Sequence, residues 1–229
     1  DLAAGTGRGG DAEGDTLSGI EEVIGSRFAD TLEGGAGDDF LEGGAGNDVL
    51  EGGAGFDTVG YGESPEAVRI DLAAGTFSGG HASGDTIASD VEAISGSRHD
   101  DTLVGAGDTN LRGQAGADTL TGGDGRVGFE GNFEDFDGDT ITNFDTDDTI
   151  RVFDRSGDGL SLTESVVDGD TILELSDGSS SVNVTLVGSF DGFALRTNRS
   201  GDAEIVAVNT TGTEGDDELV GTDGSDTLN

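Results

Sequence analysis

The sequence predicts an all-β protein whose main part is a parallel β-roll, followed by a small antiparallel β cap and the start of a further roll. Three observations predict this fold. Nine-residue units follow one another without a gap, glycine supplies 44 of the 229 residues while proline supplies 1, and a longer unit at 1–17 returns at 71–87. Tandem repeats of this kind are typical of solenoids, in which each unit contacts its neighbours.

The clearest repeats are the units at 25–33, 34–42, 43–51 and 52–60. Each begins with Gly, has Asp in sixth place and has Leu or Val in eighth place. The Gly-rich first part predicts a turn, because Gly adopts positive φ at no steric cost. The last three residues predict a short strand whose middle side chain faces inward. Two units then close one coil, and stacked coils form parallel sheets. The predicted interior consists of Leu32, Leu41, Leu50 and Val59.

Looser units extend the pattern at 96–104, 105–112, 113–121 and 122–130, and two more end the chain at 212–220 and 221–229. We therefore predict that the roll spans 1–144 and contains two copies of one larger module. Residues 209–229 are expected to be the first two repeats of a following roll.

Residues 145–208 lack the repeat and predict the antiparallel cap. Thr171–Leu175 and Val182–Val187 flank Asp177-Gly178, which is a hairpin signal. Five of the eleven phenylalanines lie between 129 and 153, around the start of this segment. We expect these aromatic side chains to close the open end of the roll.

The formal net charge of −39 decides which partners are excluded and which are needed. A chain this acidic, with ten basic residues that are all Arg, is not expected to bind nucleic acid through phosphates. No apolar run is long enough to predict a membrane span, and the absence of Cys excludes disulfides. So many carboxylates repel one another in a compact fold, and the cation that best offsets them with oxygen ligands is Ca²⁺.

These repeats resemble the RTX (hemolysin-type) calcium-binding nonapeptide family, whose consensus is G-G-x-G-x-D-x-U-x. The resemblance covers 10–60, 80–127 and 212–229, and the GGAGxD units at 34–60 are nearly consensus. It implies a right-handed parallel β-roll that binds several calcium ions between the turns of successive coils.

Turns one coil apart are predicted to lie one above the other, so that Asp30 faces Asp48 and Asp39 faces Asp57. Two facing carboxylates without a cation are unfavourable, whereas Ca²⁺ accepts six or more oxygen ligands from carboxylates and carbonyls. The resemblance also implies which residues supply them. One site would use Ser26, Phe28, Asp30, Gly43, Ala45 and Asp48. A second site would use Gly35, Gly37, Asp39, Gly52, Ala54 and Asp57.

The residues before the first repeats are predicted to extend this stack. Asp15 should pair with Asp30. Glu21 lies where the turn is shortened, so its longer side chain would reach the site of Asp39.

The second copy of the module repeats the arrangement. Asp85 is predicted to face Asp101, and Asp101 to face Asp118. Glu92 would serve the turn at 105–110.

Two places depart from the pattern. Thr109 occupies the Asp position of its repeat, so that Asp108 or Asn110 must substitute for it. In the last two repeats, Asp217 and Asp226 would share calcium with turns from elsewhere, either on this chain or through end-to-end stacking with another copy.

The leading functional prediction is a calcium-binding module without catalytic residues. In RTX relatives such segments are exported unfolded by the bacterial type I secretion machinery and fold on external calcium. We therefore expect a secreted, extracellular or cell-surface location. Because the chain begins at Asp1 and lacks Met, we expect it to be a piece of a larger secreted bacterial protein.

Two other classes of function stay open. An adhesin or carbohydrate-binding extension would need exposed aromatic side chains, yet Tyr61 is the only Tyr and Trp is absent; an ice-binding face would need longer ranks of Thr. The chain could also be the accessory part of a secreted enzyme such as a protease, lipase or alginate epimerase. No HExxH motif or serine elbow is present, so any such chemistry would lie outside these residues.

Overall fold

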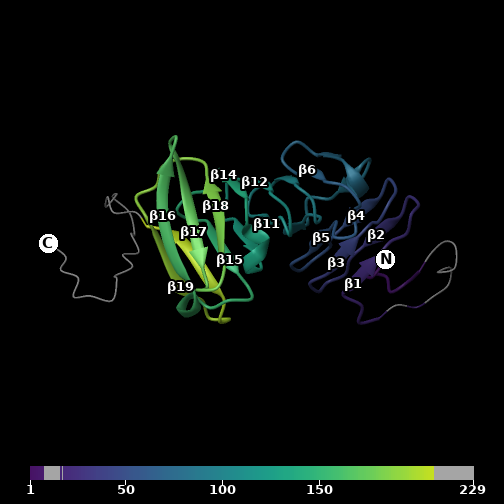
Figure 1. Cartoon of the computed structure of the whole chain (residues 1–229). Coiled ribbons are helices and arrows are strands. Elements are labelled where there is room, and N and C mark those ends of the chain that lie inside the picture. Colours follow the sequence, from purple (N-terminus) through teal and green to yellow (C-terminus); the bar gives the residue numbers. More distant parts are fainter. Residues whose placement is uncertain (8–15, 17, 209–229) are drawn as a thin grey trace.

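The computed structural model describes residues 1–7, 16 and 18–208, and it shows a stack of short strands. The stack runs from β1 at one end to the long strands β16, β17 and β19 at the other (Figure 1). The helical elements in this part of the chain are short 3₁₀ turns, namely η2 (Gly80–Ala82), η3 (Phe133–Phe136) and η4 (Gly157–Gly159). The predicted all-β parallel roll is confirmed.

One wall of the roll is a continuous nine-stranded sheet. Its strands, in spatial order, are β1 (Glu22–Ile24), β3 (Phe40–Glu42), β5 (Thr58–Gly60), β9 (Ala93–Ser95), β11 (Asn110–Arg112), β13 (Gly128–Gly131), β15 (Thr149–Val152), β20 (Ala203–Ala207) and β19 (Phe193–Thr197). Pairing is parallel as far as β15 and antiparallel beyond it. This sheet passes through both copies of the module, so the copies form one stack.

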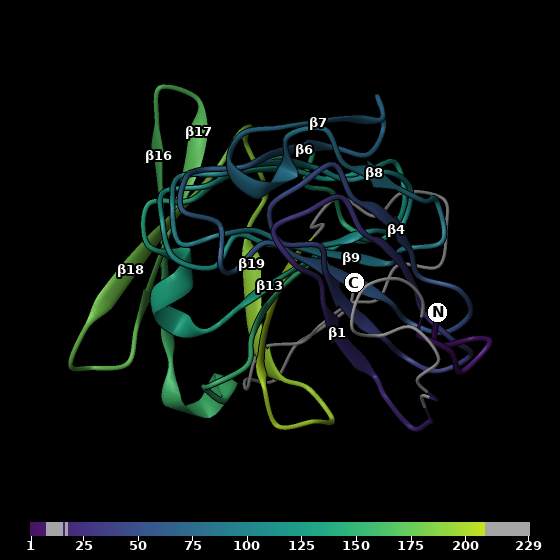
Figure 2. The ribbon, with the colours of Figure 1, turned by 90° about the vertical axis from the view of Figure 1, so that its right-hand side faces the viewer.

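The opposite wall is divided into two sheets. The first contains β2 (Thr31–Glu33), β4 (Val49–Glu51) and β8 (Thr86–Ile87). The second contains β7 (Thr76–Ser78), β6 (Arg69–Asp71), β10 (Thr102–Val104), β12 (Thr119–Thr121), β14 (Thr140–Thr142), β18 (Ser181–Leu186), β17 (Asp170–Ser176) and β16 (Ser161–Val167). Seen from the N-terminal end, β6 and β7 lie at the top of the roll and β1 lies at the bottom (Figure 2).

The strand register has the predicted coil length where the repeats are regular. Thr31 pairs with Val49 and Phe40 pairs with Thr58, so each coil contains two nonapeptides. Between the modules the register lengthens, and Val49 pairs with Thr86. Between these partners the chain adds β5 to the nine-stranded sheet, forms the β6–β7 hairpin that begins the second sheet of the opposite wall, and then returns to pair with β4.

A thin apolar interior runs between the two walls. Leu41, Leu50 and Val59 are fully buried as predicted, whereas Leu32, near the N-terminal end, is partly buried. At the other end the Phe129 and Phe144 rings lie 5.8 Å apart, and Phe190 and Phe193 continue the cluster. Because Phe129 also lies in β13, this aromatic cluster joins the roll to the strands that follow it.

The strands after residue 160 pair with one another in antiparallel fashion and extend both walls. β17 and β18 pair on either side of Asp177-Gly178, which confirms the predicted hairpin. β18 also pairs with β14 in a parallel manner, and β20 pairs with β15. We therefore propose to treat 145–208 as the closing part of the roll. The predicted further repeats at 209–229, together with Asp15, Asp217 and Asp226, lie outside the described residues.

Candidate metal centres in the turns

Asp48, Asp57 and Asp118, each in sixth place of a repeat, contact the turn one coil earlier. The Oδ1 atom of Asp48 accepts a hydrogen bond from the backbone N–H of Asp30 at 2.9 Å. Oδ1 of Asp57 accepts one from the backbone N–H of Asp39 at 2.8 Å. Asp48 and Asp57 are 0% exposed. The predicted facing of these carboxylates is therefore confirmed, and the turns form two columns along the roll.

The second oxygen of these buried carboxylates has no protein partner. Oδ2 of Asp48, Asp57 and Asp118 is buried without a hydrogen bond. Burial raises the pKa of Asp48 and Asp57, and it raises the pKa of Asp118 to about 7. A buried carboxylate oxygen without a partner is costly. A cation bound to it would supply the missing interaction, so these atoms fit a hard metal ion.

Carbonyl oxygens of the earlier turn lie directly against glycines of the turn that carries Asp48. A Cβ atom at Gly44 would clash with the carbonyl oxygen of Ser26, and one at Gly46 would lie 2.8 Å from that of Phe28. Gly44 has a φ of 85°, which also favours Gly. The predicted carbonyl donors of the first site therefore lie directly against the turn that carries Asp48.

The second predicted site has the same construction. Cβ atoms at Gly53 and Gly55 would clash with the carbonyl oxygens of Gly35 and Gly37. In the part of the chain that the structure describes, no three His, Asp or Glu side chains gather closely enough to hold a metal by themselves. A site made of two carboxylates and several carbonyls meets the preference of calcium for oxygen ligands without such a cluster.

The prediction that Asp85 faces Asp101 is wrong. Oδ1 of Asp85 accepts a hydrogen bond from the backbone N–H of Asp48 at 2.9 Å, and Oδ2 accepts one from the Tyr61 hydroxyl at 3.0 Å. The physical reason is that β8 returns to β4 after the insertion, so Asp85 ends the column that contains Asp48. At Asp85 a tyrosine hydroxyl provides the contact that is missing at Asp48.

A new column begins with Asp101. Its Oδ1 accepts a hydrogen bond from the backbone N–H of Val68 at 2.7 Å, because β6 is the strand beside β10. The backbone N–H of Asp101 donates to Oδ1 of Asp118 at 2.7 Å, which confirms the predicted facing of this pair.

The prediction that Glu92 serves the turn at 105–110 is also wrong. Its Oε2 accepts a hydrogen bond from the backbone N–H of Asp57 at 2.8 Å, so its carboxylate serves the turn at 52–57. Only its backbone carbonyl meets the later coil, through the N–H of Asn110. Asp48, Asp57 and Asp118, in sixth place of their repeats, reach toward the previous coil in the same way. The backbone carbonyl of Glu21 accepts from Phe40, which places Glu21 beside Asp39.

A known family matches the repeats of this chain. The profile of the RTX calcium-binding nonapeptide repeat matches in four copies, at residues 24–59, 104–126 and 211–229. These three stretches therefore match the RTX calcium-binding repeat. A similar solved structure is the extracellular lipase LipA from Serratia marcescens, at 20% identity and a TM-score of 0.30, covering 77% of this chain. The chain spans 39% of the length of that lipase. No curated protein matches the chain.

In the degenerate RTX repeat at 105–112, Thr109 stands at the Asp position and no neighbouring carboxylate takes its place. The Thr109 hydroxyl donates to the carbonyl of Ala106 in its own turn. Oδ1 of Asp108 accepts from the backbone N–H of Arg126 at 2.9 Å, which is the contact that Asp38 makes with Phe56. Asp108 therefore occupies the place before the RTX aspartate, and the expected substitution by Asp108 is wrong. Asn110 bonds Gly128 and Glu130 instead.

Sequence reasoning missed two acids that continue the RTX columns. Oδ1 of Asp139 accepts from the backbone N–H of Asp118, and Oδ1 of Asp148 accepts from that of Val127, both at 2.8 Å. Burial raises the pKa of Asp139 to about 8. A signal was present, because Asp139 and Asp148 are each followed by Thr-Ile, as Asp85 is.

Proposed function

We propose that this chain is a non-catalytic module of a secreted bacterial protein and that it folds when calcium fills its turns. The observation that carries the proposal is the pair of buried Oδ2 atoms of Asp48 and Asp57, which have no hydrogen-bond partner and lie in turns packed directly against carbonyl oxygens of the turn one coil earlier. Apolar burial in so thin a roll offsets little of the conformational entropy lost on folding. Calcium binding would supply the remaining stabilisation because it requires the folded turns.

The proposed centres are the two regular sites and one in the second module. The first uses Asp30 and Asp48 with carbonyls of Ser26, Phe28, Gly43 and Ala45. The second uses Asp39 and Asp57 with carbonyls of Gly35, Gly37, Gly52 and Ala54. The third lies between Asp101 and Asp118, where Oδ2 of Asp118 also lacks a partner. When bound, calcium would offset the repulsion between the facing carboxylates.

The location and export route follow from the required affinity. Extracellular calcium modules bind at about 10⁻⁴ to 10⁻³ M. Sites of that strength would stay empty in the cytosol, and the chain would pass the type I secretion machinery unfolded and fold outside. Within residues 1–7, 16 and 18–208, no helix is long and apolar enough to cross a bilayer.

Circular dichroism with and without calcium tests the proposal. In excess chelator we expect mostly coil, and millimolar Ca²⁺ should restore the β spectrum. Magnesium should substitute poorly, because it demands a small octahedral site and loses water reluctantly. Equal β content in calcium and in chelator would overturn the coupling of folding to calcium.

A further inference from the structure

A hollow of about 430 Å³ lies on the outer face of the nine-stranded sheet, at the ends of β3, β9, β11 and β13. Its walls carry two aromatic rings, Phe40 and Phe153, and planar polar side chains that include Arg98, Gln114, Asn132 and Asp135. Small-molecule sites are concave and have volumes in this range. Arg98 and Gln114 lie in the two turns that carry Asp101 and Asp118, but the hollow uses their side chains, which the proposed calcium centres do not use.

The cationic part of the hollow is Arg98. No ion pair links Arg98 to any acid among the described residues, and its side chain is exposed. The neighbouring Arg112 is held by Glu130 at 2.8 Å and lies over the Phe153 ring at 5.1 Å. Arg98 is therefore the guanidinium in this hollow that is free to bind an anion.

Gln114, in the wall of the hollow, has a strained backbone conformation at a place where the regular repeats have Gly. It has a φ of 69° and stands second in its nonapeptide, where Gly44 and Gly53 have φ values of 85° and 104°. A non-Gly residue in this region is strained, and such strain concentrates at functional sites. Its Nε2 donates to Ser95 and Gly96, which directs the amide along the wall of the hollow.

The two Phe side chains of the hollow, Phe40 and Phe153, are positioned to contact a ligand. The Phe40 ring lies across Gly60, where a Cβ atom would clash with the ring. Gly60 replaces the Glu found at the same place in the three preceding repeats, 25–33, 34–42 and 43–51. Phe153 is 37% exposed. The exposed aromatic surface that a sugar needs is therefore supplied by Phe.

We propose that this hollow binds a single acidic sugar residue, with its carboxylate at Arg98, its ring against Phe40 or Phe153, and its hydroxyls at Gln114, Asn132 and Asp135. Guanidinium groups bind carboxylates in a planar, paired geometry. Nε2 of Gln114 and Nδ2 of Asn132 already donate within the protein, so Oε1 of Gln114 and Oδ1 of Asp135 are the acceptors offered to sugar hydroxyls. The net charge of −39 disfavours a long polyanion, so a ligand with one carboxylate fits best.

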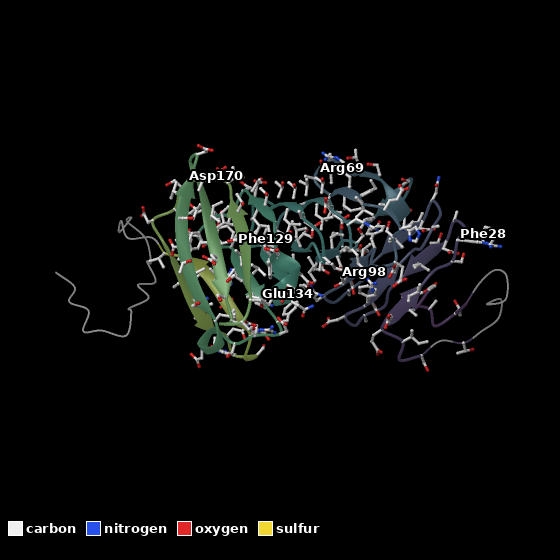
Figure 3. All side chains as sticks on the ribbon, viewed as in Figure 1. Phe28, Arg69, Arg98, Phe129, Glu134 and Asp170 are labelled. Carbon is white, nitrogen blue, oxygen red and sulfur yellow. The ribbon has the colours of Figure 1, made fainter. Side chains whose placement is uncertain are left out.

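Calorimetric titration of the calcium-saturated full chain with sodium glucuronate, glucose and sodium acetate tests the proposal at one fixed free calcium concentration. Glucuronate should bind more tightly than glucose or acetate. Arg98→Gln should weaken glucuronate binding about ten-fold, the scale of one charge-assisted hydrogen bond, and leave glucose binding unchanged. Arg69→Gln is the matched control, because Arg69 lies on the other wall of the roll, opposite Arg98 (Figure 3).

Gln114→Gly is the second test, because Gly is the residue found at this place in the regular repeats. This variant should keep the calcium-dependent β spectrum while weakening both glucuronate and glucose. The proposal is overturned if glucuronate does not saturate the wild-type chain, if acetate binds as tightly, or if Arg69→Gln weakens binding as much as Arg98→Gln. Unchanged binding in Gln114→Gly would also overturn it.

Discussion

At the scale of single residues, the two oxygens of one aspartate have different roles. Oδ1 of Asp48 is used by the backbone of the previous turn, while Oδ2 is buried without a partner. The first contact positions the carboxylate, and the second atom is the one available to a cation. The same division holds at Asp57 and Asp118.

Asp48→Asn separates these roles. An Asn retains an acceptor for the N–H of Asp30 but places N–H donors where the cation would bind. We expect the calcium midpoint of folding to rise about ten-fold, since a ligand contact to a charged group is lost. Asp124→Asn is the control, because Asp124 is exposed in a degenerate turn. Equal shifts in the two titrations would show that the assigned ligand positions are wrong.

The raised pKa values predict how the calcium-free fold responds to pH. Burial raises the pKa of Asp118 to about 7 and that of Asp139 to about 8, from a usual 3.8. The folded state therefore binds these protons more tightly than the unfolded state. Its stability should be greatest at acid pH and should fall as pH rises from about 4 to about 8.

In chelator we therefore expect more β structure at pH 5 than at pH 8, measured by circular dichroism. In saturating calcium the difference should disappear, because the bound cation keeps the carboxylates ionised in the folded state. Loss of β structure on acidification in chelator would contradict this assignment.

At the scale of the element, each column of turns continues only while its strands pair in sequence. The column of Asp30 and Asp48 ends at Asp85, where Tyr61 supplies a hydroxyl. The next column begins at Asp101, beside the backbone of Val68. The break between the two sheets of this wall therefore coincides with the break between two groups of turns.

Tyr61→Phe tests the end of the first column. The substitution leaves Oδ2 of Asp85 buried without its hydrogen bond, and we expect the free energy of unfolding in calcium to fall by about 1 to 3 kcal/mol. Denaturant titration measures the loss, and calcium stoichiometry should stay unchanged. An increase in stoichiometry would show that the hydroxyl had been filling a cation site.

At the scale of the whole molecule, the two ends of the roll differ. β1 is an edge strand, and Ile24 within it is 60% exposed. The opposite end is closed by the Phe144, Phe190 and Phe193 cluster and by antiparallel strands. The end-to-end stacking of copies stays a prediction, because the last two repeats lie outside the described residues.

This asymmetry predicts an order of unfolding. At limiting calcium, amide hydrogen exchange should lose protection first in β1 to β3 and last in β13 to β15, since local opening begins where few apolar contacts are buried. Mass spectrometry of peptides from each region follows the order. Earlier loss in β13 to β15 would show that the aromatic cluster does not stabilise its end of the roll.

The sequence by itself determined the coil, its inward residues and the facing of Asp30 with Asp48 and Asp39 with Asp57. These features follow from neighbouring repeats alone, because a constant repeat length places equivalent turn residues one coil apart. The same reasoning predicted the Asp101–Asp118 pair and the hairpin at Asp177-Gly178. Asp139 and Asp148 were within reach of sequence reasoning through the Thr-Ile that follows each.

Only the tertiary structure decided what happens between the modules. The sequence between the modules does not show which strand the chain pairs with when the repeats resume, and that pairing places Asp85 beside Asp48 and Glu92 beside Asp57. The hollow is likewise a product of folding, since Phe40 and Phe153 are brought to one sheet face by five intervening strand pairings, β3 to β15. Contacts within a repeat follow from its own residues, whereas contacts across insertions depend on which edge of a sheet the chain meets.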